Sequence, residues 1–446
     1  MKRLLSAMLA TVAMAFAMVA KDVPSGAWSG KLNVGGSKLN LVFNFAPDGS
    51  CTLDSPDQGA KGITATVGVL TADSVNVSIP AIGGSYSGRV EAESIVGTFS
   101  QSGYSFPLTL TPGGVVLNRP QTPKPPHPYT TEEVAFANPS DGAVLKGTLT
   151  YPLLYALDGN ATPVVLLVSG SGLQNRDEEL FGHKPFAVIA DYLAMRGIAS
   201  LRYDDRGFGK STGDTSAATT ATFAGDAAAG VAYLRKTGKF GKVGVVGHSE
   251  GGTIAFILGA DKKADFIVSL AGGALPGDSI LLQQNKSFLV LGGVSPMAAD
   301  DYCKALGRIF SLLASGKKQI DVDALLSAEN ITLPEELVQN LKEIEPSMTP
   351  WLAYYLSLDP RKDIAKAGCP VFALNGSKDL QVNAKSNLSA IKNTLPANEK
   401  NRIEEYPGLN HLFQHCTTGS IAEYGSIEET FSTDALRDIA DWIKSL

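Results

Sequence analysis

The 446-residue sequence has few of the residues that form disulfide frameworks or hold metals: four cysteines and five histidines. The cysteines are scattered, without C-x-x-C spacing or a cluster typical of a metal site. They are Cys51, Cys303, Cys369 and Cys416. We therefore expect no metal and no cofactor. A chain of this size needs no covalent staples, so buried free thiols are favoured, although an exported protein could pair some of them.

An excess of positive charge is also missing. The sequence has 38 Lys and Arg against 44 Asp and Glu, a formal net charge of -6. Nucleic-acid-binding domains carry a basic footprint, so nucleic acid is excluded as an expected partner. The hydrophobic content of 44% and charged content of 18% are those of a globular protein. The length exceeds what one ordinary core needs and predicts two or three domains.

Long apolar runs are absent except near the start of the sequence. Residues 4–19 are apolar, follow Lys2 and Arg3, and contain a small-x-small cleavage pattern at 15–17. This pattern predicts a secretory signal peptide over about residues 1–20, with an uncleaved anchor as the alternative. We expect a periplasmic or extracellular protein without stable membrane insertion after cleavage. The sequence indicates no oligomeric state.

Residues 21–118 lack both helical periodicity and histidine. Short runs such as 38–45 alternate between apolar and polar residues, and Gly, Asp, Ser and Pro separate them every eight to twelve residues. This predicts a small all-β accessory domain, either a lipocalin-like barrel or a sandwich, that packs or binds without catalysing. Five prolines between residues 119 and 128 then predict a stiff linker over 119–130.

Residues 131–446 alternate between strand and helix patterns. The nearly all-apolar runs are typical of buried parallel strands; they are 163–169, 198–203, 242–246, 266–270 and 371–375. We predict an α/β fold, a doubly wound and mostly parallel sheet with helices on both faces. A helical insertion over about 275–364 is expected to form a cap that shapes a substrate pocket, the alternative being a stabilising flange.

The sequence Gly-His-Ser-Glu-Gly at residues 247–251 lies between an apolar strand and an apolar helix. A Gly-x-Ser-x-Gly at such a junction predicts a nucleophile elbow, a tight turn that exposes the hydroxyl of Ser249. Side chains at Gly247 and Gly251 would collide with the strand and the helix. The amide of Glu250 is predicted to be one oxyanion donor, and Ser171, with Gly172 beside it, the other.

A serine nucleophile needs a histidine base oriented by a carboxylate. Elimination among the five histidines favours His411, which follows a late strand, over His415. The others are His127 in the linker, His183 before the elbow and His248 inside it. Asp379 follows the strand 371–375 and is the predicted acid. We also predict that Arg206 pairs with Asp177 or Glu178 and braces the oxyanion loop.

Taken together, these motifs resemble those of an α/β-hydrolase of the bacterial serine esterase/dienelactone-hydrolase group. The resemblance covers most of 130–446 and is carried by segments 169–177, 203–207, 247–252, 375–379 and 409–413. It implies Ser249, His411 and Asp379 as a catalytic triad. One departure is Ser169, which stands where the oxyanion loop commonly begins with His-Gly. The 21–118 region is similar to domains that precede such hydrolases in exported bacterial proteins.

We therefore expect an exported serine carboxylesterase that hydrolyses a small-molecule or carbohydrate ester through an acyl-enzyme, and we expect the acyl chains to be short. Two alternatives stay open. One is a peptidase or aminoacyl-hydrolase on the same fold, in which Glu178 or Asp205 would anchor the substrate amine. The other is a non-catalytic glycan-binding protein with a relic triad.

Overall fold

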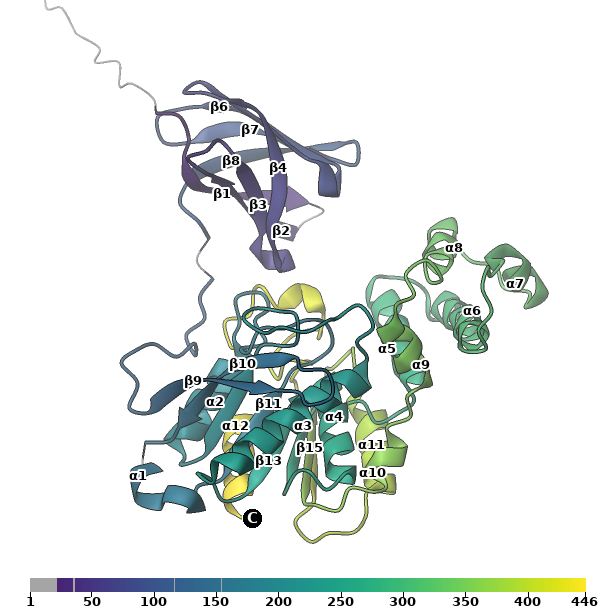
Figure 1. Ribbon diagram of the computed structural model, residues 1–446. Coiled ribbons are helices and arrows are strands. Elements are labelled where there is room, and N and C mark those ends of the chain that lie inside the picture. Colours follow the sequence, from purple (N-terminus) through teal and green to yellow (C-terminus); the bar gives the residue numbers. More distant parts are fainter. Residues whose placement is uncertain (1–21, 35–36, 116, 154) are drawn as a thin grey trace, which may run out of the picture. The chain divides into compact units, whose positions relative to one another are not determined.

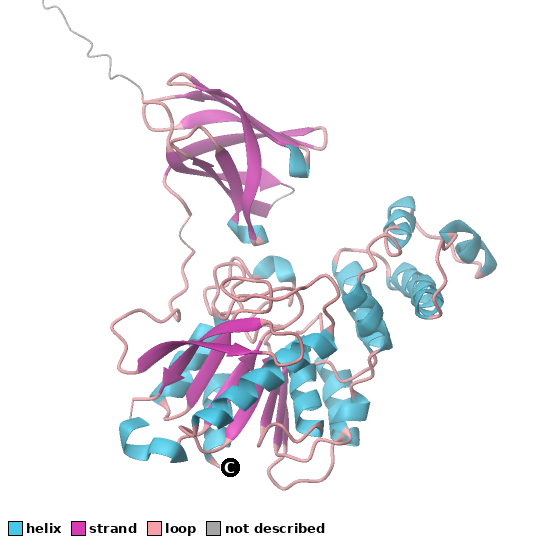
Figure 2. Ribbon diagram, viewed as in Figure 1, coloured by secondary structure: helices cyan, strands magenta, loops and turns pink. Residues whose placement is uncertain are grey.

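The structure, a computed structural model, describes residues 22–34, 37–115, 117–153 and 155–446. The predicted signal peptide lies outside these residues. The chain divides into two compact units between Leu117 and Asn118, and each is described by itself (Figures 1 and 2). Among the described residues, no helix combines the length and the apolar character that crossing a membrane requires.

The first unit is a closed antiparallel barrel of eight strands in sequential order, with β1 pairing β8. The strands are β1 (Gly26–Val34), β2 (Ser37–Phe45), β3 (Cys51–Ser55), β4 (Ala60–Leu70), β5 (Ser74–Ile79), β6 (Gly84–Val90), β7 (Ile95–Gln101) and β8 (Tyr104–Pro112). Two short 3-10 helices, η1 (Pro56–Gln58) and η2 (Pro80–Ile82), join β3 to β4 and β5 to β6. Of the two predicted all-β arrangements, the closed barrel is the one found.

Alternation along the strands fills the barrel. Phe43, Phe45, Tyr86 and Phe99 point inward and are fully buried, as expected where successive side chains face opposite sides of a sheet. The hydroxyl of Tyr86 donates to the carbonyl oxygens of Ile95 and Leu108, at 3.0 and 3.1 Å, so this buried polar atom is satisfied.

The second unit contains an eight-stranded sheet in the order β16-β15-β14-β13-β11-β12-β10-β9. The strands are β9 (Thr130–Ala137), β10 (Val144–Tyr151), β11 (Val164–Val168), β12 (Ala199–Tyr203), β13 (Val243–His248), β14 (Ile267–Leu270), β15 (Val371–Gly376) and β16 (Arg402–Tyr406). Strands β11 to β16 run parallel, and the β9–β10 hairpin joins β12 antiparallel. The predicted mostly parallel sheet is confirmed.

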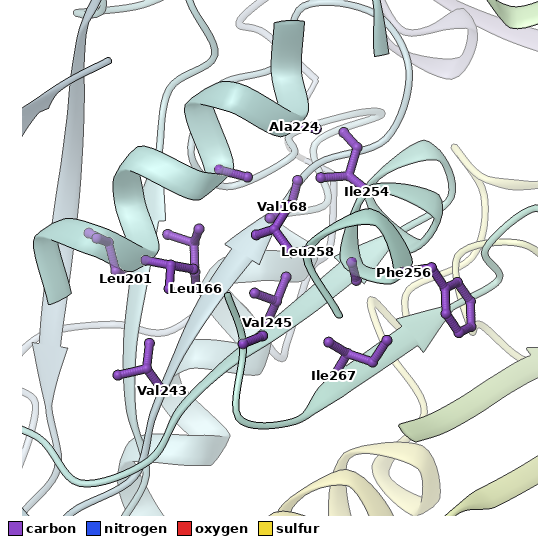
Figure 3. Close-up of a cluster of buried hydrophobic side chains, with 14 of the residues drawn as sticks. Leu166, Val168, Leu201, Ala224, Val243, Val245, Ile254, Phe256, Leu258 and Ile267 are labelled. Atoms are coloured by element: carbon purple, nitrogen blue, oxygen red, sulfur yellow. The ribbon is translucent and has the colours of Figure 1, made fainter. Parts of the chain in front are cut away.

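Helices cover both faces of this sheet. One buried cluster joins the strands to α3 (Thr220–Thr237), α4 (Glu250–Ala260) and α11 (Ala384–Thr394). Figure 3 shows part of this cluster, which includes Leu166 and Val245 of the sheet and Ile254 and Leu258 of α4. The opposite cluster joins the sheet to α2 (Pro185–Met195) and α12 (Thr433–Lys444). The carboxyl ends of the central strands are thereby left for loops.

A run of helices separates β14 from β15. They are α5 (Gly277–Leu291), α6 (Pro296–Ala314), α7 (Val322–Ala328), α8 (Glu335–Lys342), α9 (Pro350–Ser357) and α10 (Arg361–Ile364). Helices α5 to α9 have a small apolar core of their own, with Leu306, Ile309 and Leu341 buried. Helix α9 contacts α3 and α5, so this cap reaches the part of the sheet where the elbow lies (Figure 1).

Three short helices complete the described part of the second unit. Helices α1 (Tyr155–Asp158) and η3 (Gly159–Ala161) precede β11, and η4 (Ile421–Glu423) lies in the loop after β16.

All four cysteines are free thiols, and burial raises the pKa of Cys51 and of Cys369 to about 11. Thiols with such pKa values stay protonated and unreactive at neutral pH.

The start of the predicted linker is packed against the second unit. Arg119 is buried and donates hydrogen bonds to the carbonyl oxygens of Phe181, Gly425 and Ile427. Gln121 donates to the carbonyl oxygen of Phe431 at 2.7 Å. These first residues therefore belong structurally to the unit that follows them.

Candidate active site

Ser249 occupies a strained turn between β13 and α4. Its φ is 54° and its ψ is -118°, a backbone conformation that residues other than glycine rarely adopt. A Cβ at Gly247 would lie 1.9 Å from the carbonyl oxygen of Gly251, and one at Gly251 would lie 2.1 Å from that of Val168. Both glycines are therefore required for the turn to close, as the sequence pattern predicted.

Asp379 and His411 are brought together from two different loops. Asp379 follows β15, and its Oδ1 accepts hydrogen bonds from the amides of Gln381 and Val382 at 2.8 and 2.9 Å. Its Oδ2 accepts from Nδ1 of His411, in the loop after β16, at 2.7 Å. Both side chains are buried. This geometry fixes the orientation of the His411 ring and leaves Nε2 as its second nitrogen.

Ser249 is far from His411 in the sequence, but the residue before it contacts His411. His248, the residue before Ser249, has its ring centroid 4.8 Å from that of His411. Among the described residues, neither the Ser249 hydroxyl nor Nε2 of His411 has a hydrogen-bond partner. Contacts between a nucleophile and its base are often loose without substrate and tighten in the reacting complex. Asp379 and His411 are thus in direct contact, and Ser249 adjoins them without a hydrogen bond.

The other histidines have partners elsewhere. His183 is buried, with Nδ1 2.9 Å from the Thr430 hydroxyl and Nε2 3.0 Å from the carbonyl oxygen of Tyr424. Burial and the charge of Arg119 lower its pKa to about 4. His415 is exposed and bonds Glu429. The ring of His127 stacks on that of Tyr129.

The structure contains a second buried histidine–carboxylate pair that sequence reasoning missed. Nδ1 of His248 lies 2.9 Å from Oε1 of Glu178, and Nε2 lies 2.9 Å from the carbonyl oxygen of His411. A carbonyl oxygen only accepts, and Oε1 already accepts from the amide of Gly170 at 2.7 Å. With Glu178 ionised, both nitrogens of His248 donate hydrogen bonds, which is the imidazolium form of the ring.

Electrostatics agree with this protonation state. Burial alone would lower the pKa of His248, but the negative charge and hydrogen bond of Glu178, together with the His411 carbonyl group, raise it overall. Glu178 itself has a φ of 51°, so the backbone is held in an unfavourable conformation where the carboxylate is delivered. The pair connects the loop of Gly170, the residue before Ser249 and the backbone of His411.

The predicted oxyanion loop passes directly over the elbow. A Cβ at Gly170 would come within 3.1 Å of the Cβ of Ser249. The Gly170 amide is committed to Glu178. Among the described residues, the amides of Ser171 and Glu250 donate to no acceptor, so both remain available to an oxyanion. Ser169 takes part through its hydroxyl, which donates to Oδ1 of Asp205 at 3.2 Å.

Asp205 holds this loop in place through hydrogen bonds. Its Oδ2 accepts from the amide of Gln174 at 2.8 Å. Burial raises the pKa of Asp205 to about 7, against the opposing effect of its hydrogen bonds with Gln174 and Ser169. The carboxyl group therefore titrates near neutral pH, directly behind the loop that faces Ser249.

The predicted role of Arg206 is wrong. Its guanidinium group is buried and bonds both carboxylate oxygens of Asp226 at 2.7 Å, and Asp141 at 2.7 Å. Asp177 is instead paired with Arg202. Arg206 therefore ties its loop to α3 and to the β9–β10 hairpin. The sequence showed a rigid loop but not the direction that its arginine would take.

The cap touches the elbow through one buried carboxyl group. Oε1 of Glu250 accepts from the Thr220 hydroxyl at 2.6 Å and from the indole nitrogen of Trp351, in cap helix α9, at 2.9 Å. Burial raises the pKa of Glu250, although these two hydrogen bonds oppose the shift. The Trp351 ring stacks on Tyr355. An aromatic face of the cap thus lies beside the residue that follows Ser249.

Several known proteins resemble part of this chain. Residues 183–289 match the family model described as "Serine aminopeptidase, S33". Esterase EstD of Thermotoga maritima is 28% identical over 250 residues, which cover 56% of this chain and 54% of that enzyme. The match therefore spans about half of the length of this relative.

Solved structures give a more distant likeness. An esterase of Pyrococcus furiosus has a TM-score of 0.43 at 16% identity, covering 75% of this chain and 99% of its own. A proline iminopeptidase of Mycobacterium smegmatis has a TM-score of 0.42 at 14% identity, covering 70% and 98%. Scores of this size carry no argument about activity.

The doubly wound sheet and the strand–serine–helix turn agree with the family-model match and with the relative. We conclude that the second unit has an α/β-hydrolase fold, and that a closed β-barrel unit precedes it in the sequence.

Proposed function

We propose that the protein is a serine carboxylesterase that cleaves short-chain acyl esters through an acyl-enzyme. The observation that carries this proposal is the buried hydrogen bond of 2.7 Å between Nδ1 of His411 and Oδ2 of Asp379, in loops that adjoin the strained turn at Ser249. A histidine held in this way presents Nε2 as a base beside a serine, which is the arrangement that acyl transfer needs.

Each group has a defined role in this mechanism. Nε2 of His411 takes the proton of Ser249 as the hydroxyl oxygen attacks the ester carbonyl carbon. Asp379 keeps the proton of His411 on Nδ1 and stabilises the imidazolium that forms. The amides of Glu250 and Ser171 donate to the oxyanion. His411 then protonates the leaving alcohol and afterwards activates the water that releases the acid.

The surroundings support an ester in preference to a peptide amine. An aminopeptidase needs a carboxylate for the substrate's ammonium group. Glu178 is already bonded to His248 and Gly170, and Asp205 to Ser169 and Gln174; both are buried. The name of the curated relative also points to an ester. The description of the family model favours an aminopeptidase as the second candidate.

Labelling with a fluorophosphonate tests the nucleophile. We expect the protein to be labelled and the Ser249→Ala variant to be unlabelled. His411→Ala should abolish labelling as well, whereas His415→Ala, which removes an exposed histidine, should leave it unchanged. Labelling that persists in Ser249→Ala would contradict the proposal.

Substrate class is tested with p-nitrophenyl esters of increasing acyl length beside aminoacyl anilides. We expect turnover of acetyl and butyryl esters to exceed that of every anilide by at least a factor of about 10². Faster cleavage of an anilide would favour the aminopeptidase. Absence of both labelling and turnover would favour the glycan-binding alternative.

Export forms part of the proposal and rests on residues 1–20. A positively charged start followed by an apolar stretch directs secretion, and signal peptidase then removes the segment. N-terminal sequencing of the protein from periplasmic and culture fractions should find a start close to residue 18 or 21. A protein that keeps Met1 and stays in the cytoplasm would contradict it.

A further inference from the structure

The barrel contains a cavity of about 530 Å³, within the range of small-molecule binding sites. It opens toward the end of the barrel where β3 joins β4, β5 joins β6 and β7 joins β8. Residues of all three connections line it: Gln58, Ile82 and Ser102. In an up-and-down barrel these connections share one end, so the cavity lies in the mouth of the barrel.

Aliphatic and aromatic side chains form its walls. Leu41, Leu53 and Phe99 are buried at its inner part. Ile63 and Phe106 are half-buried nearer the opening. Apolar side chains that remain accessible to water forgo part of the stability that burial would give. A ligand that covered them would recover it.

The polar groups of the mouth are neutral. The Ser55 hydroxyl donates to Oε1 of Gln58 at 2.7 Å, and Nε2 of Gln101 donates to the carbonyl oxygen of Ile82 at 2.9 Å. Each glutamine thus has one further amide atom, Nε2 of Gln58 and Oε1 of Gln101, that bonds no described residue. One donor and one acceptor are therefore available at the opening.

The lining residues include no Lys, Arg, His, Asp or Glu. A ligand with an ionised head group would lose hydration there without gaining a counter-ion, which is costly. A hydroxyl or an ester group, by contrast, can bond a glutamine amide without a charge.

We propose that the barrel is a binding site for an uncharged aliphatic molecule, a chain of methylenes that ends in a hydroxyl or an ester group. The chain occupies the apolar walls, and its oxygen bonds Gln58 or Gln101. This site is separate from the groups around Ser249 and does not depend on the activity proposed for them.

Calorimetric titration of the full chain with 1-alkanols tests the proposal, in a Ser249→Ala background so that no ester is turned over. Each added methylene should tighten Kd about fourfold until the cavity is full, since burying one contributes about 0.8 kcal/mol. The alkanoates of equal length should bind at least tenfold more weakly at neutral pH. Equal affinity of alkanols and alkanoates would overturn the assignment of an uncharged ligand.

Matched tryptophan variants locate the site. Ala60 lines the cavity and Ala81 is exposed outside it. Ala60→Trp should fill the cavity and weaken alkanol binding at least tenfold, and Ala81→Trp should leave Kd unchanged. Ile63→Asn, a smaller change at the opening, should weaken binding several-fold. Equal binding by all three variants would overturn the proposal, as would the absence of alkanol binding in the parent protein.

Discussion

The barrel and the hydrolase unit differ in what they bury. Among the described residues of the barrel, the buried side chains with a hydroxyl group are those of Ser55 and Tyr86, and the other buried side chains are apolar. The hydrolase unit buries carboxylates, arginines and three histidines, several of them around Ser249. They include Glu178, Asp205, Arg206, Asp226, Glu250, Asp379, His183, His248 and His411.

The difference follows from how each unit closes. Antiparallel neighbours in the barrel point alternate side chains into one shared interior, which excludes water and selects apolar residues. Parallel strands end together, and their loops converge at one edge, where hydrogen bonds from loop amides can support buried charges. Buried charged side chains are therefore concentrated in the second unit, whereas the barrel contains an apolar cavity.

The largest expected effect is a loss of kcat when the carboxylate of a buried histidine–carboxylate pair is replaced, compared with the same replacement in an exposed pair. Asp379→Asn should lower kcat for a short-chain ester about 10⁴-fold, because His411 loses the group that fixes its tautomer. Glu429→Gln, beside the exposed His415, should change kcat less than twofold. Steady-state kinetics on both purified variants measure this, and similar losses in the two would contradict the assignment of His411.

Breaking the second buried pair should mainly affect stability. Glu178→Gln removes the carboxylate opposite His248, and loss of one partner from a buried pair can cost about 3 kcal/mol. The control Glu91→Gln, in the exposed Arg89–Glu91 pair of the barrel, should cost less than about 0.5 kcal/mol. Urea unfolding gives both values.

The effect of Glu178→Gln should depend on pH. The raised pKa of His248 means that its stabilisation is complete below its unfolded pKa and is lost as pH rises through the folded value. The difference in unfolding free energy between wild type and variant should therefore narrow at high pH. A difference that is constant from pH 6 to 9 would contradict the imidazolium.

Asp205 should also make the unfolding free energy depend on pH. Its pKa of about 7 exceeds the usual 3.8, so the folded protein binds more protons than the unfolded chain between these values. The unfolding free energy should fall as pH rises from about 4 to 7, and this contribution should disappear in Asp205→Asn. Urea unfolding at intervals across this range, with Glu399→Gln at an exposed position as control, measures the slope.

The smallest effect is expected inside the barrel. Tyr86→Phe removes one hydroxyl that serves two carbonyl groups and should cost about 1 kcal/mol. Hydrogen exchange should accelerate in β6, β7 and β8 without a change in the hydrolase unit. Accelerated exchange around Ser249 would contradict an effect confined to the barrel.

The sequence predicted those parts of the molecule that local pattern controls. Apolar runs located the parallel strands, and the glycines around Ser249 identified a turn that excludes side chains. The chain order of Asp379 and His411 placed them at neighbouring strand ends, where they meet. In the barrel, β1, β3 and β6 were not predicted as separate strands, because small and polar residues such as Gly88 and Ser85 obscure their alternation.

The contacts that side chains make between loops could not be predicted from the sequence. Arg202, in β12, and Arg206, in the loop that follows, are four residues apart, and nothing local decides which of them reaches Asp177. The pairing of Glu178 with His248 likewise depends on a loop that folds back over the elbow. A histidine inside the elbow and a glutamate after the oxyanion loop were visible, but their meeting is a property of the tertiary fold.

The packing of Arg119 and Gln121 determines where a fragment that contains the hydrolase unit alone should begin. A fragment that begins at β9 would look complete by its strands, yet it would leave carbonyl groups of residues 181, 425, 427 and 431 without their donors. Those residues include the far end of the loop that carries His411. An expression start at Asn118 keeps the donors, so the first codons of the hydrolase unit lie before its first strand.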